Sequence, residues 1–120
     1  MSLIVNVYQR GEDGAIILLD SPNHSEELAG VEVCRQQLWG AASTRSLGLT
    51  LLPSLAESDL YAEGDDLTQL GQEAQTILEN VAFLARETGY GDEYIAFRTR
   101  NILSAVERAK QVAQGGVVVF

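Results

Sequence analysis

The sequence predicts an α+β fold, a two-layer sandwich in which a sheet of about four strands carries an antiparallel helix pair on one face. Three observations favour it. The chain ends on four apolar residues, 117–120, which two glycines separate from an amphipathic helical pattern at 92–114. A second helical pattern, with apolar residues at steps of three and four, begins at Asp65 or Asp66 and stops at Gly89. Only residues 87–91 separate the two helical patterns. So short a connection makes the two helices antiparallel neighbours.

The two ends of the chain both predict strands. Residues 3–8 are rich in β-branched and aromatic side chains, and residues 15–19 form a second apolar run, so the pair predicts a β-hairpin. The second run does not alternate, which is typical of a strand covered on both faces. Residues 117–120 are expected to be a strand pressed into the sheet, because four apolar side chains are unfavourable in water.

Residues 20–23 are of types typical of a turn, and residues 25–40 after them are predicted as a helix. Ser25 can cap its first turn, and two acids follow in that turn. Trp39, near the end of the segment, is expected to anchor the core. An alternative remains open, because residues 31–33 alternate as a strand would.

The middle of the chain predicts a third strand and then a loop. Residues 47–52 are mostly apolar and are stopped by Pro53, so they predict a strand. Residues 54–64 are predicted as a loop. The order is then β-β-α-β-α-α-β in one domain, 1–120, with no internal repeat or linker.

Composition indicates a globular chain with an acidic surface. Of 120 residues, 46% are apolar, and 17 acidic against 8 basic residues give a net charge of −9. This charge disfavours nucleic acid and anionic membrane surfaces as partners and favours a cationic one. The single cysteine, Cys34, excludes an internal disulfide, and no apolar run is long enough to span a membrane. The expected compartment is the cytoplasm.

The sequence contains no recognisable catalytic, cofactor or metal motif. A calcium loop starting at Asp59 would place Gly64 correctly at its sixth position, but Leu70 falls at the twelfth, where a carboxylate is needed. Phosphate-binding glycine loops and a serine nucleophile elbow are absent. His24 and Cys34 are the sole residues of their types, which is too few for a zinc site. No catalytic residue, metal ligand or cofactor is therefore predicted.

The densest group of charges is the candidate partner-binding surface. It lies just before the first long helical pattern and combines acids with one tyrosine. Its members are Glu57, Asp59, Tyr61, Glu63, Asp65 and Asp66. Residues 1–85 carry three arginines against thirteen acids, whereas residues 86–120 carry five basic residues against four acids. This split predicts that the arginines of the last helix pair with acids of the first 85 residues.

These observations favour a non-catalytic, small, acidic, cytoplasmic protein that binds another protein, such as an inhibitor or immunity-type neutraliser of a basic enzyme. A first alternative is a self-assembling structural or accessory subunit, a homo-oligomer, because the apolar strands exceed what one helix pair covers. A second alternative is an enzyme that uses carboxylates, with Asp59, Glu63 or Asp65 acting beside an arginine.

Overall fold

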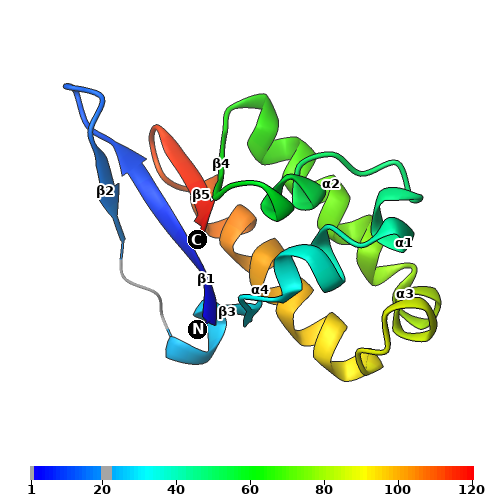
Figure 1. The fold of residues 1–120 in the computed structure, drawn as a ribbon. Helices are drawn as coiled ribbons and strands as arrows, with labels where there is room; N and C mark the ends of the chain where they lie inside the picture. Colours follow the sequence, from blue (N-terminus) through cyan, green and yellow to red (C-terminus); the bar gives the residue numbers. More distant parts are fainter. Residues whose placement is uncertain (1, 20–22) are drawn as a thin grey trace.

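The computed structural model describes residues 2–19 and 23–120 and has the α+β architecture predicted (Figure 1). In the described chain, one antiparallel sheet has the strand order β2-β1-β5-β4, and β3 pairs with β1 beside this path. The helices gather on one face of the sheet (Figure 1). The strands are β1 (Ser2–Arg10), β2 (Ile16–Leu18), β3 (Leu28–Val31), β4 (Leu60–Glu63) and β5 (Gly115–Val119).

The terminal strand lies in the middle of the sheet, as the apolar tail predicts. Val119 of β5 is paired with Val5 of β1 on one side and with Leu60 of β4 on the other. The backbone of Phe120 continues the ladder: its N–H donates to the Ile4 carbonyl at 2.9 Å, and its carbonyl accepts from the Ile4 N–H at 2.9 Å. The predicted hairpin of β1 and β2 is also confirmed. Residues 20–22 of the predicted turn lie outside the described residues.

Three helices form the second layer: α2 (Asp65–Leu78), α3 (Val81–Thr88) and α4 (Asp92–Ala109). The predicted packing of a helix pair is confirmed by α2 and α4. The prediction of one continuous helix up to Gly89 is wrong, because the chain leaves the helical conformation at Asn80, with φ −127° and ψ 24°. The Asn80 side chain donates to the Thr76 carbonyl at 2.8 Å, a local bond that competes with helix continuation.

The predicted helix at 25–40 is instead three short elements: a 3₁₀ helix (His24–Glu27), β3 and a π-helical turn (Arg35–Trp39). The short helix α1 (Ala42–Arg45) follows just beyond this segment. Gly30 accounts for the break: its φ of 113° is incompatible with a helix, and a Cβ there would lie 3.0 Å from the Cys34 sulfur. The strand alternative holds only as far as Val31.

The strand predicted at 47–52 is also wrong, and the strand of this region, β4, falls inside the predicted loop. A 3₁₀ helix, Leu52–Ala56, follows residues 47–51. The buried carboxylate of Glu73, on α2, accepts hydrogen bonds of 3.0 to 3.1 Å from the backbone N–H groups of Thr50, Leu51 and Leu52. These amides are therefore held by a distant side chain and are not free to enter a sheet ladder.

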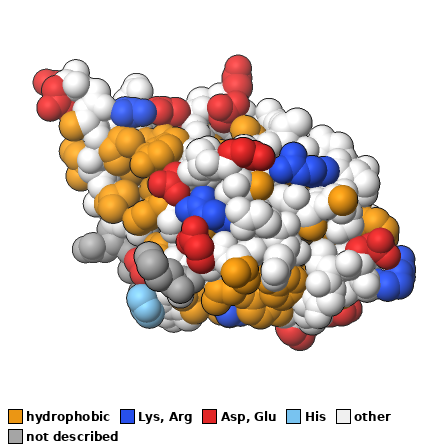
Figure 2. Space-filling model, viewed as in Figure 1, with side chains coloured by type: hydrophobic (Ala, Val, Ile, Leu, Met, Phe, Trp, Pro, Cys, Tyr) orange, Lys and Arg blue, Asp and Glu red, His pale blue; other side chains and the backbone are white. Residues whose placement is uncertain are grey.

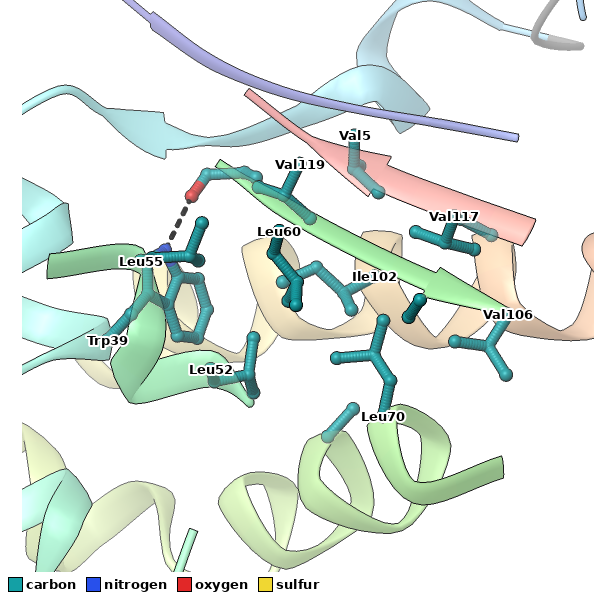
Figure 3. Close-up of a cluster of buried hydrophobic side chains, with 14 of the residues drawn as sticks. Val5, Trp39, Leu52, Leu55, Leu60, Leu70, Ile102, Val106, Val117 and Val119 are labelled. Carbon is teal, nitrogen blue, oxygen red and sulfur yellow. Dashed lines mark hydrogen bonds between the residues drawn. The ribbon is translucent and has the colours of Figure 1, made fainter. Parts of the chain in front are cut away.

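The core lies between the sheet and the helices (Figure 3). Val5, Val117 and Val119 point from the strands toward Ile102 and neighbouring helix side chains, and these four named residues are fully buried. Trp39 is buried as predicted, and its indole N–H donates to the Ala29 carbonyl at 3.1 Å. One face of the sheet thus forms part of the core.

Tyr8 lies across a glycine on the opposite face of the sheet. Tyr8 of β1 is paired with Gly116 of β5, and a Cβ built on Gly116 would overlap the Tyr8 ring. The ring itself has no exposed surface. Glycine is therefore required at position 116 because the Tyr8 ring lies close to its backbone, and not because of an unusual φ.

We expect Gly116→Ala to lower the free energy of unfolding by about 1–3 kcal/mol, because the added methyl displaces a buried ring. The measurement is urea denaturation in a double-mutant cycle with Tyr8→Ala. In the Tyr8→Ala background the same substitution should cost much less. An equal cost in both backgrounds would show that the overlap is not the cause.

Candidate functional site

The face of the sheet that points away from the helices is the candidate site, here called the outer face. Side chains alternate along a strand, so the neighbours of the core valines point to this side. Figure 2 shows hydrophobic side chains gathered over the strands at the left of the view. A shallow hollow of about 280 Å³ lies on the outer face. Its lining residues are Ile16 and Leu18 of β2, Tyr61 of β4, Val118 of β5 and the terminal Phe120.

The outer face has a buried floor and an exposed apolar border. Val118, which lines the hollow, is 2% exposed, and Tyr8 is completely buried beneath this face; these two residues are here called the floor. By contrast, Leu18 is 52%, Tyr61 50% and Phe120 39% exposed. Isolated exposed apolar residues are ordinary, whereas this contiguous group around one hollow makes the outer face the candidate interaction surface.

Tyr8 supplies a rigid, neutral floor. Its ring meets Tyr61 edge to face, with centroids 6.2 Å apart and an interplanar angle of 65°. Burial, together with the negative charge of neighbouring Glu63, raises the pKa of the Tyr8 hydroxyl to about 12. Within the described chain the hydroxyl lies beside this carboxylate without reaching hydrogen-bond geometry. The floor therefore carries no charge at neutral pH.

A single ion pair borders the floor. The Arg10 guanidinium donates to the Glu63 carboxylate, with Nη2 to Oε1 at 2.9 Å, and Nη1 donates to the Gly14 carbonyl at 2.7 Å. The Arg10 hydrogen bonds lower the pKa of the Glu63 carboxyl below its ordinary value. The same guanidinium lies 5.8 Å from the Tyr8 ring centroid. This ion pair next to the floor is thus polar but electrically balanced.

Three of the five acids on the predicted acidic surface are paired with arginines within the described chain. Glu57 is 3.7 Å from Arg45, and Asp59 is 2.7 Å from Arg35. With the Glu63 pair, each of three acids of the predicted site meets a different arginine of the first 85 residues. Burial alone would lower the Arg35 pKa, but the hydrogen bonds that its guanidinium donates to Asp59 and Glu32 outweigh burial and raise that pKa.

The six predicted site residues therefore do not share one environment. Tyr61 and Glu63 belong to the outer face. Asp65 and Asp66 are exposed in the first turn of α2. Strand β4, at roughly 3.3 Å per residue, separates these two aspartates from Glu57 and Asp59. The predicted site residues do not include the apolar members of the outer face, although the runs at 15–19 and 117–120 motivated the alternative of self-assembly.

The arginines of the last helix do not make the predicted pairing within the described chain. The ion pair that α4 contributes there joins Arg100 to Glu93 of the same helix, at 4.0 Å. Arg98 instead lies 4.0 Å above the Tyr94 ring, which stacks on Tyr90 with centroids 5.2 Å apart. This cation–aromatic stack orders the start of α4.

The sole histidine and the sole cysteine take part in local contacts. His24 Nδ1 lies 3.0 Å from a Glu27 oxygen at the surface. Cys34 is buried, and its sulfur lies 3.6 Å from the Tyr94 hydroxyl. Across residues 2–19 and 23–120, no three His, Cys, Asp or Glu side chains are grouped to hold a metal ion.

Comparisons with protein-family models, curated proteins and solved structures gave no significant match. None of the described helices has the length and apolar character needed to cross a bilayer. The functional assignment therefore depends on the geometry of the described residues. Two features matter most: the apolar sheet face that the helices leave uncovered, and the three acids paired with arginines.

We expect Glu63→Gln to reduce the free energy of unfolding at pH 7 by less than about 1 kcal/mol, because the ion pair is half exposed. The pKa of Glu63 is lowered in the folded state, so its contribution is complete above the unfolded pKa. It is lost as the pH falls through the folded pKa. Urea denaturation at pH 7, 5 and 3 should show the difference between variant and wild type closing in acid.

Glu107→Gln, which changes an exposed acid on α4, is the matched control. A Glu63→Gln difference that stayed constant or widened between pH 7 and pH 3 would contradict the assigned role of the Arg10 pair.

Proposed function

We propose that this chain is a non-catalytic protein-binding domain that engages another protein through the outer face of its sheet. One observation carries the proposal: three large apolar side chains, Leu18, Tyr61 and Phe120, surround a buried floor and are each about half exposed or nearly so. Aromatic side chains over a rigid floor are typical of the anchors that dominate binding energy. We place this activity in the cytoplasm, which suits a single unpaired cysteine.

The size of the apolar border sets what the partner must supply. Fully burying one large apolar side chain contributes about 1.5–3 kcal/mol, so three half-exposed ones contribute roughly 2–5 kcal/mol. Association costs about 4–15 kcal/mol in lost freedom of motion. The partner must therefore bring apolar side chains of its own into the hollow, which favours a folded protein surface over a small polar ligand.

Charge supports the choice of the outer face over the acidic segment. The net charge of −9 would speed encounter with a basic enzyme that this protein neutralises, as the sequence suggests. Yet Glu57, Asp59 and Glu63 are already held by arginines, so less of the segment is free to meet a cationic partner. The negative field is therefore a secondary aid to encounter in this proposal.

The carboxylate-enzyme alternative gains no support from the geometry. Asp59 and Glu63 are bound to two different arginines and do not face each other in a cleft. A general acid also needs a raised pKa, whereas the pKa of Glu63 is lowered.

Affinity capture with matched variants tests the proposal. We expect Leu18→Lys to weaken capture of the bound protein at least tenfold, because it places a charge in the apolar border. Val33→Lys is the control, since Val33 lies outside the hollow and is 51% exposed against 52% for Leu18. Circular dichroism should show that both variants fold. Equal capture by wild type and both variants would contradict the proposal.

A further inference from the structure

We infer that the partner seated on the outer face is a second copy of this chain, related to the first by a two-fold axis. This inference rests on the proposed function, because it names the occupant of the same surface.

The charge of the outer face fits a copy of itself better than it fits a basic protein. The side chains that line the hollow carry no charge, although the whole chain carries a net charge of −9. The adjacent charged side chains, Arg10 and Glu63, are opposite and already joined at 2.9 Å. A basic partner would therefore meet no acidic side chain in the lining of the hollow. Two identical faces would meet with no unpaired charged side chain at the centre, in keeping with the depletion of charged residues at interface cores.

The shape of the outer face also permits a contact with a second copy. Leu18 and Phe120 project at the border of a hollow of about 280 Å³. That volume is just below the roughly 300–1,000 Å³ of small-molecule pockets, and it suits the insertion of one or two side chains. In an isologous contact each copy offers projecting side chains to the hollow of the other. Two sheets packed in this way form a sandwich about 10 Å thick, with the floor side chains at its centre.

The apolar contribution is doubled in such a dimer. Each copy buries the same three half-exposed side chains, so the roughly 2–5 kcal/mol from one face is matched by the other. The sum is comparable with the cost of association. The two copies repel each other through their net charges, and this repulsion weakens as salt shortens the Debye length. Dimerisation should therefore strengthen with salt, whereas capture of a basic protein should weaken.

Analytical ultracentrifugation of the full chain from 1 to 200 µM, at 50 mM and 500 mM NaCl, tests the inference. We expect wild type to dimerise, with a lower dissociation constant at 500 mM NaCl. Leu18→Lys and, as an independent second variant, Phe120→Lys should each raise that constant at least tenfold. Val33→Lys should leave it unchanged. All three variants lower the net negative charge equally, so added repulsion cannot explain a loss of dimer.

Two results would overturn the inference: a wild type that stays monomeric at 200 µM, or a dimer that Val33→Lys disrupts while Leu18→Lys and Phe120→Lys leave it intact. A monomeric wild type that still captured another protein in a Leu18-dependent way would overturn the second copy alone. If the wild type were monomeric and Leu18→Lys also left capture unchanged, both the inference and the proposed function would fail.

Discussion

The pairing of the last strand, β5, with both β1 and β4 is the constraint on which the rest of the structure depends. It joins the first ten residues, the middle of the chain and its end in one sheet. Val117 and Val119 enter the core, while Val118 between them forms part of the outer floor. A single strand therefore stabilises both faces, and the helix layer packs onto a surface that exists only when β5 is in place.

The two faces of this sheet have different surroundings because the described helices cover only one of them (Figure 1). On the covered face, aliphatic side chains of β1, β4 and β5 pack against α2 and α4. On the other face, Tyr8 is buried by its own neighbours, leaving an exposed apolar border. The chain also pairs three of its acids with arginines from distant positions. The surface that remains apolar and uncovered is therefore small and well defined, which supports its assignment as the binding surface.

Local patterns predicted the elements whose stabilising contacts repeat along the sequence. The hairpin, the start of α4 and the buried terminal strand follow from such patterns. The failures have non-local or single-residue causes. Glu73 holds the amides of residues 50–52 from another helix, Gly30 adopts a φ of 113°, and Asn80 interrupts the long helix. None of these effects changes the apolar periodicity on which the predictions depended.

The candidate site was only partly predictable for the same reason. The sequence predicts Tyr61 and Glu63 as partner-binding residues because acids cluster around them. Leu18 and Phe120 were recognisable as strand residues, but their exposure depends on which face the helices cover. Likewise, the arginine that pairs with Asp59 is 24 residues away in the sequence, and the arginine that pairs with Glu63 is 53 residues away. Composition predicted the sign of the charge and could not predict its local neutralisation.

Native-state hydrogen exchange of the Val117, Val118 and Val119 amides tests the central role of β5 most directly. If the strand is the middle of the sheet, these amides should be among the slowest in the chain. Their free energy of opening should equal that of global unfolding measured by denaturant. Exchange of these three amides at the rate of a frayed terminus, while β1 and α4 remain protected, would contradict the account.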